Sequence, residues 1–301
     1  STPCEIFQPY YGEAIARYML NMFTEKILPQ QEQQDLPLII YEVGGGNGTC
    51  ARNVLQYIER TRPDIFQRVQ YNIIEISQTL HELQCKNLSK YVGMGKFKSH
   101  QSSIFDWHKV ETQPCFFIAL EVLDNMPHDK VWIQNDGIFE THVVLNEETK
   151  RLEEKLIDIN DPLIVQYLQL MNVIENQEQQ EQEAIATAHF KLPQLYKNHV
   201  DLRVKQSIFT SLFQKSKDIF NPMWINSIGG YKALYIPTCK LQMLNILKEK
   251  FPFHSLVIAD FDKLPAEEAG TVNPPLVQQK RFNNTTQEYF TMSFKSYLVP
   301  R

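Results

Sequence analysis

A glycine-rich turn between an apolar segment and a helical segment constrains the fold of this chain more than any other feature. Residues 42–48 read EVGGGNG. The preceding residues 38–43 are nearly all apolar and rich in β-branched side chains, as in a parallel strand that is covered on both faces. Residues 49–60 carry apolar side chains at helical spacing and end before Pro63. Strand, glycine turn and helix in this order predict the beginning of an α/β domain.

Further segments repeat this alternation. Apolar runs at residues 71–76, 115–120 and 255–259 are typical of buried strands, and helical patterns lie at 78–87 and near 240–250. Alternating strands and helices favour a doubly wound, mostly parallel sheet, so the predicted fold class is α/β and Rossmann-like.

The middle of the chain interrupts the alternation. Apolar runs at 131–134 and 138–145 flank Asn135-Asp136-Gly137, which predicts a β-hairpin, and helical stretches follow. We therefore expect four parts: an N-terminal helical segment packed on the core (1–37), a cofactor-binding core (38–130), an inserted hairpin and helical cap (131–230), and a return to the core sheet (231–301).

Composition excludes several functions. The formal net charge is −5, so nucleic acid is not an expected partner. The five cysteines show no C-x-x-C spacing and the histidines no ligand spacing, so we expect no metal and a reducing compartment. No apolar run approaches the roughly 18 residues that span a bilayer, so we expect a soluble protein without a membrane span.

The glycine turn predicts a cofactor site. Gly44, Gly46 and Gly48 allow close approach of the backbone to a ligand, and the helix that begins at Thr49 offers free N–H groups to an anion. Two cofactors fit at this point. The anion is either the carboxylate of S-adenosyl-L-methionine or, because Gly46 and Gly48 are followed by Ala51 at fingerprint spacing, the pyrophosphate of a dinucleotide.

Glu42 favours S-adenosylmethionine of the two. At the tip of the strand its charge would attract the ammonium and sulfonium groups of the methyl donor but repel a pyrophosphate. Glu75 ends the second apolar run and suits a carboxylate that accepts both ribose hydroxyls, a role shared by both cofactors.

Residues that follow the second strand complete the predicted cofactor site. Ile76 follows Glu75 directly and is included in it. In segment 102–106, Ile104 and Phe105 would form an apolar wall for adenine, and Asp106 a polar contact. Asp106 has an equally ordinary alternative role, which is to cap a turn.

Two acids follow the predicted strand at 115–120. In an open α/β sheet the ligand crevice lies outside the carboxyl ends of the strands, so Glu121 and Asp124 should face the methyl group of the donor. We predict them to be the catalytic residues. The alternative is that they hydrogen-bond the loop or cap the next segment.

Taken in order, these segments resemble the motifs of the MidA-type methyltransferases, whose mitochondrial members include a complex I assembly factor that methylates arginine. The matches are E-x-G-P-G-x-G-T at 42–49 with Gly45 in place of proline, V-E-x-S at 74–77, E-F-F-D-x-x-P at 121–127, S-P-E-I-S-x-x-F-G-E at 2–13 and, more weakly, L-x-I-D-Y-G at 256–261. Leu120 replaces a polar residue, and a distal D-I-x-x-x-x-D-F block is absent, as in a divergent, fungal-like branch.

The resemblance implies a class I methyltransferase fold, S-adenosylmethionine as cofactor, a mitochondrial location and a protein arginine as methyl acceptor, on a respiratory or other mitochondrial subunit. Glu121 and Asp124 would then orient the guanidinium and remove its proton. Two alternatives stay open. Leu120 and Gly45 suit an assembly or scaffold protein that keeps the pocket with little or no catalysis, and the Gly46–Gly48–Ala51 spacing suits a dinucleotide-dependent oxidoreductase.

Overall fold

The computed structural model describes residues 2–30, 35–134, 137–168, 170, 233–260, 271–272, 277–283 and 286–292. The chain divides into two compact units. The first comprises Ser1–Met126 and Cys239–Lys263, and the second Pro127–Thr238 and Leu264–Arg301. The part of the predicted cap at 171–230 lies outside the described residues. The four-part division at residues 37, 130 and 230 stays a prediction, and the two units have other bounds.

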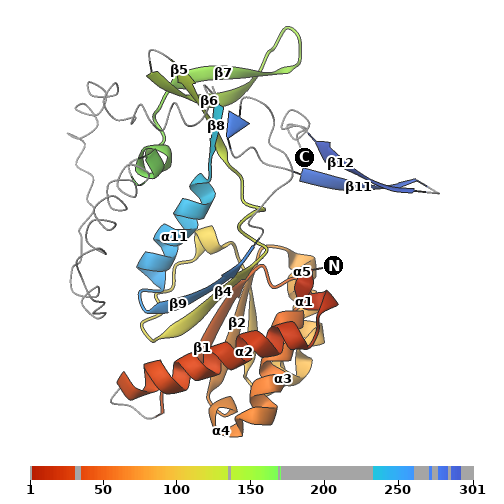
Figure 1. Cartoon of the computed structure of the whole chain (residues 1–301), viewed down its shortest axis with the longest axis vertical. Helices are drawn as coiled ribbons and strands as arrows, with labels where there is room; N and C mark the ends of the chain where they lie inside the picture. The colour runs from red at the N-terminus through yellow and green to blue at the C-terminus, as the bar shows by residue number, and fades with distance from the viewer. Residues whose placement is uncertain are drawn as a thin grey trace, which may run out of the picture. The chain divides into compact units, whose positions relative to one another are not determined.

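The first unit contains a five-stranded, fully parallel sheet (Figure 1). The strand order is β3-β2-β1-β4-β9, as expected for a Rossmann-like α/β fold, so the predicted fold class is confirmed. The strands are β1 (Leu38–Val43), β2 (Val69–Glu75), β3 (Phe97–Gln101), β4 (Cys115–Leu120) and β9 (His254–Ala259). Sequence reasoning anticipated all of them except β3.

Helices cover both faces of this sheet, so β1 is buried on both sides. Its successive side chains point alternately to the two faces. Leu38 and Ile40 pack into one core cluster with α2 and α3, whereas Ile39 and Tyr41 pack into another with Met243 of α11. The longer helices are α2 (Tyr10–Met22), α3 (Thr49–Thr61), α5 (Gln78–Asn87) and α11 (Thr238–Lys250). Shorter helical segments are α1 (Pro3–Ile6), η1 (Phe23–Ile27), η2 (Leu28–Gln30), α4 (Pro63–Phe66), α6 (Ser89–Gly93) and η3 (Ile104–Asp106).

The order of the strands places the ligand crevice. From β1 the chain continues to β2 and β3 on one side, and then crosses to β4 on the other side of β1. The carboxyl ends of β1 and β4 therefore flank the point where the order reverses, which is where open α/β sheets bind ligands. The glycine turn follows β1, and Glu121 follows β4.

The N-terminal segment lies along α3 (Figure 1). Asn47 Nδ2 donates to Glu5 Oε1 at 2.7 Å, and Arg60 Nη2 donates to Glu13 Oε1 at 2.8 Å. Arg60 is 63% exposed, so its ion pair with Glu13 adds little to stability.

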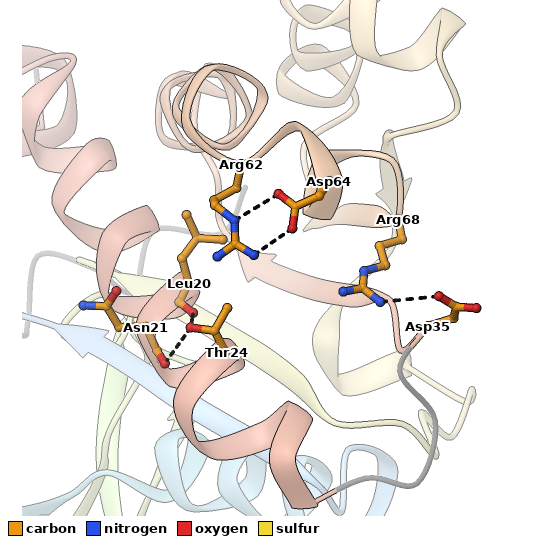
Figure 2. Close-up of polar contacts among 7 residues, drawn as sticks. All are labelled: Leu20, Asn21, Thr24, Asp35, Arg62, Asp64 and Arg68. Carbon is orange, nitrogen blue, oxygen red and sulfur yellow. Dashed lines mark hydrogen bonds and ion pairs between the residues drawn. The ribbon is translucent and has the colours of Figure 1, made fainter.

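Polar contacts also lie at the C-terminal ends of α2 and α3 (Figure 2). Arg62 precedes α4, and its Nε and Nη2 donate to the two carboxylate oxygens of Asp64 at 2.9 and 2.7 Å. Thr24 Oγ1 donates to the backbone oxygen of Leu20 at 2.9 Å. The fork-shaped pair of Arg62 and Asp64 closes the turn between α3 and α4.

The second unit has a mixed sheet of order β10-β8-β5-β6-β7. Its strands are β5 (Asp129–Gln134), β6 (Gly137–Leu145), β7 (Leu152–Asp158), β8 (Ala233–Ile236) and β10 (Thr271–Val272), and β11 (Val277–Asn283) pairs with β12 (Thr286–Met292) separately. The predicted hairpin is confirmed, since β5 and β6 pair antiparallel with Val131 opposite Glu140. No helix in the described ranges has the length and apolarity needed to cross a membrane.

The close crossing of α2 and α3 generates a prediction about stability. A Cβ atom at Gly12 would lie 2.6 Å from Asn53 Cβ, which cannot move away without shifting α3. We expect Gly12→Ala to lower the free energy of unfolding by about 1–3 kcal/mol, measured by urea denaturation. A Cβ atom at Gly93 in α6 meets nothing within 4 Å, so Gly93→Ala is the matched control and should be neutral or slightly stabilising. Equal stability of the two variants would contradict this account of the crossing.

Candidate functional site

The glycine turn has the backbone conformation that a close ligand contact requires. Gly44, Gly46 and Gly48 have φ angles of +66°, +50° and +79°, in the left-handed region that favours glycine. At Gly48 a Cβ atom would lie 2.5 Å from Leu88 Cδ1, so this glycine is also needed for packing. At Gly46 a Cβ atom would meet nothing within 4 Å. The backbone at Gly46 therefore faces space that a ligand can fill.

The turn leads directly into the N-terminus of α3. Gly48 is the N-cap residue and has no side chain, so the N–H groups of the first turn, beginning at Thr49, receive no side-chain cap. Gly48 N–H donates to Gly45 O at 2.9 Å and closes the turn before the helix. Uncapped N–H groups at the positive end of a 13-residue helix attract an anion such as a carboxylate.

A buried carboxyl group lies behind the turn. Glu42 is only 3% exposed, and its Oε2 accepts a hydrogen bond from Tyr71 Oη at 2.8 Å. Burial raises the pKa of Glu42 to about 7, and the charge of Glu75 acts in the same direction. A cation bound nearby would favour the ionised form of Glu42 and lower that pKa.

Glu75 is held at the carboxyl end of β2 by two donors. Its Oε1 accepts the Ser77 N–H at 2.9 Å, and its Oε2 accepts Gln84 Nε2 at 3.3 Å. The neighbouring Ile76 is 74% exposed, so its apolar surface is open to a ligand at this edge of the sheet. The pair combines a fixed carboxylate with an open apolar surface.

The segment after β3 is anchored to the same edge. Ser102 N–H donates to the backbone oxygen of Glu75 at 3.0 Å. Ser103 Oγ accepts the Phe105 N–H at 3.1 Å and so caps η3, whereas Asp106 is exposed on it. Ile104 is buried in the core. Ser103, and not Asp106, is therefore the residue that caps this turn.

Acidic residues gather at the carboxyl ends of β4 and β9. Glu121 has a φ of +52°, an uncommon conformation for a non-glycine residue and one that concentrates at functional sites. Asp260 Oδ2 accepts the Asp124 N–H at 2.9 Å, and Asp124 Oδ1 accepts Asn125 Nδ2 at 2.8 Å. Partial burial, followed by repulsion from neighbouring acids, raises the pKa values of both Glu121 and Asp124.

One pocket brings part of the predicted site together. Its lining includes five of the predicted residues, Glu42, Gly44, Gly46, Thr49 and Glu121. The other predicted residues are not part of this lining: Gly48, Glu75, Ile76, Ile104, Phe105, Asp106 and Asp124. Gln84 connects the two groups, because its Nε2 donates both to Gly46 O at 2.8 Å and to Glu75.

The same pocket has walls that sequence reasoning missed. They come from the N-terminal segment, the turn itself and the end of β4: Thr2, Pro3, Cys4, Glu5, Tyr11, Gly45, Asn47, Cys50 and Leu120. The only available signal for the N-terminal group was the family-like block at 2–13, which carried no chemical role. Asp260 was also missed, because its partner Asp124 is 136 positions away in the chain.

The residues fit S-adenosylmethionine. Gly46 offers open space beside its backbone, the end of α3 offers uncapped N–H groups, and Glu75 offers a buried, oriented carboxylate. Glu42 adds a negative charge behind the turn once it is ionised. Among the residues of known placement, no cluster of three or more histidine, cysteine or acidic side chains could hold a metal ion.

Comparisons with known proteins agree with this chemistry. Residues 14–299 match a family described as "Putative S-adenosyl-L-methionine-dependent methyltransferase". The chain is also 23% identical, over 261 residues, to the mitochondrial protein arginine methyltransferase NDUFAF7 homolog of Schizosaccharomyces pombe. That alignment covers 83% of this chain but 48% of the relative, so the chain spans about half of the relative's length.

Two solved structures from Burkholderia thailandensis are similar in part. One is bound to S-adenosyl-homocysteine, is 17% identical with a TM-score of 0.39, and the match covers 51% of this chain and 35% of that one. The other, a native structure, is 18% identical with a TM-score of 0.38, and the match covers 50% and 36%. The family match extends over most of the chain and confirms the MidA-type resemblance. The chain therefore belongs to the family of S-adenosylmethionine-dependent methyltransferases, and S-adenosylmethionine is the cofactor of that family.

Proposed function

We propose that this chain binds S-adenosylmethionine at the glycine turn and transfers its methyl group to an arginine side chain of a protein. Family membership supports the donor over a dinucleotide. The name of the Schizosaccharomyces pombe relative supports the acceptor. The observation that carries the proposal is Glu121, a strained acid in the same pocket as Gly44 and Gly46, next to two further acids.

In this proposal the donor's carboxylate lies against the glycines of the turn and the N-terminus of α3 at Thr49. Glu42 balances its cationic groups, and Glu75 accepts the ribose hydroxyls. The side chains that meet adenine are Ile76, Phe105 and Asp106, whereas Ile104 is buried in the core cluster against which Phe105 packs. The uncapped helix end, the buried Glu42 and the exposed Ile76 support these roles.

The acids at the ends of β4 and β9 suit a cationic acceptor. Burial and then repulsion from Asp124 and Asp260 raise the pKa of Glu121, and burial and then repulsion from Asp260 raise that of Asp124. A guanidinium placed beside these acids would relieve the repulsion. Arginine stays protonated in water, so a site that methylates it must orient the guanidinium and accept a proton. We assign orientation to both acids and proton removal to either one.

S-adenosylmethionine supplies an activated methyl group: a guanidine nitrogen forms the new C–N bond as the C–S bond breaks, which leaves S-adenosylhomocysteine and one proton. The protein aligns the two reactants for in-line attack, and a carboxylate of Glu121 or Asp124 takes the proton. We further propose a mitochondrial location and a respiratory or other mitochondrial subunit as substrate, which the name of the relative supports.

A scaffold role is the second candidate. Leu120 lines the pocket where the family motif has a polar residue, and this favours weakened catalysis. A scaffold protein would bind the donor tightly. It would transfer no methyl group to any protein in a lysate of cells from which this protein has been deleted. The two candidates therefore differ in turnover and not in donor binding.

The first prediction for this site concerns the donor. By calorimetry, S-adenosylmethionine should bind and NAD should not. Glu75→Ala should weaken donor binding by about 1–3 kcal/mol, because the ribose hydroxyls lose a charged acceptor. Gly46→Val should weaken it further, since a β-branched residue cannot adopt the φ of +50° without strain. Normal binding by a folded Gly46→Val protein would remove the turn from the site.

The second prediction concerns protons released on binding. With a pKa of about 7, about half of the Glu42 carboxyl groups are protonated at pH 7, and a bound cation should ionise them. Calorimetry in phosphate and in Tris, which differ in ionisation enthalpy, should show release of up to about half a proton. S-adenosylhomocysteine, which has no sulfonium charge, should release less, and Glu42→Gln should abolish the effect. Equal release by Glu42→Gln would exclude Glu42 as the source.

The third prediction concerns catalysis. Glu121→Gln and Asp124→Asn should keep donor affinity within about twofold and lower transfer of a labelled methyl group by at least ~100-fold, as expected for loss of a general base. Asp64→Asn is the control, because Asp64 is an exposed acid paired with Arg62 and does not line the pocket. If both test variants lose donor affinity in proportion to activity, the acids are cofactor ligands and not catalytic residues.

A further inference from the structure

Gln84 is a fully buried amide in the middle of α5. Its Nε2 donates to Gly46 O at 2.8 Å and to Glu75 Oε2 at 3.3 Å, and its Oε1 accepts Ser99 Oγ at 2.7 Å. All the polar atoms of this side chain are therefore engaged. Two of its three partners belong to the glycine turn and to the acid at the end of β2.

The orientation of this amide has one solution. Ser99 has a single hydroxyl hydrogen, and it is directed at Gln84 Oε1. The contact of 2.8 Å between Ser99 Oγ and His81 Nδ1 must then be donated by His81, so Nδ1 carries a hydrogen. A flipped amide would place Oε1 against Gly46 O and the Glu75 carboxylate, and those atoms are all acceptors. The chain of donors thus runs from His81 through Ser99 and Gln84 toward the site.

α5 also packs directly against the glycine turn. A Cβ atom at Gly48 would come within 3.6 Å of Gln84 Cγ and 2.5 Å of Leu88 Cδ1. Gln84 lies on α5, and Leu88 is the C-cap residue of the same helix. Close packing and hydrogen bonding therefore act at the same point. A shift of α5 would move the turn and Glu75 together.

We propose that Gln84 is a positioning residue that holds the glycine turn and the Glu75 carboxylate in a fixed relation, so that the two grip opposite parts of one adenosyl ligand. This inference rests on the proposed donor site. An amide suits the task because it is neutral. It donates to the buried Glu75 carboxylate without neutralising its charge, which leaves that carboxylate free to accept ligand hydroxyls.

Gln84→Met tests the proposal, because methionine has a similar volume and no strong donor. The probes are S-adenosylhomocysteine and its 2′-deoxy analogue, with binding measured by calorimetry. We expect the variant to bind S-adenosylhomocysteine at least ~10-fold more weakly, and the loss for the deoxy analogue to be clearly smaller. The Michaelis constant for S-adenosylmethionine should rise, with kcat at saturating donor changed by less than about threefold. A merely structural defect would weaken both probes equally.

Two more variants keep the test decisive. Ser99→Ala leaves Gln84 in place but removes the hydroxyl that orients it, so it should show a smaller loss of the same kind, even if Gln84→Met does not fold. Asn87→Ala is the matched control. Asn87 is exposed on the same helix, and its side-chain amide donates to Asn47 O at 3.0 Å, next to Gly46, rather than to Glu75. Its affinity for both probes should stay within about twofold of the parent protein.

Two results would overturn the assignment: equal losses for the two probes, or a loss in Asn87→Ala as large as in Gln84→Met. Failure of the proposed function is distinguishable, because the parent protein would then bind neither probe. In that case the effect of Gln84 on the glycine turn could still be measured by amide hydrogen exchange of residues 44–48. Exchange there should be faster in Gln84→Met than in Asn87→Ala, and equal rates would refute that effect.

Discussion

The arrangement of the site depends on the pairing of β1 with β2 on one side and with β4 on the other. Val43, the last residue of β1, lies beside Ile74 and Ala119, so the chain leaves all three strands at nearly the same height. The glycine turn, Glu75 and Glu121 therefore meet at one edge without any long side chain reaching across. A register shift of one residue would exchange the β1 side chains between the two core clusters and move every one of these groups.

Most of the sheet could be predicted because its central strands are apolar runs bounded by turns. β3 could not, since its residues are FKSHQ, an edge strand whose polar side chains show no apolar pattern. β7 is exposed along nearly its whole length and carries an equally weak signal. Both strands form because neighbouring strands offer backbone hydrogen bonds, a cause that a local pattern does not record.

The candidate site divides in the same way. The sequence predicted the positions of the turn at 44–48, Glu75 and Glu121, because each lies at the end of a predicted strand. Gln84 was not predicted, because its importance lies in partners on two other elements. The N-terminal wall of the pocket was missed for the same reason, since Glu5 meets Asn47 across 42 positions of chain. Contacts between distant segments are decided by packing and not by local preference.

The split of the first unit into two chain segments has a consequence for the order in which it is completed during synthesis. β1 to β4 emerge from the ribosome as one stretch, and with them the glycine turn, Glu75 and Gln84. β9 and Asp260 emerge only after residues Pro127–Thr238 of the second unit, so the contact between Asp260 and the Asp124 N–H forms later than the pairing of β1 to β4. Until then the side of β4 that later pairs with β9 has no strand beside it. The glycine turn, Glu75 and Gln84 can thus take their places early, whereas the contact that holds the Asp124 backbone waits for the second segment of the unit.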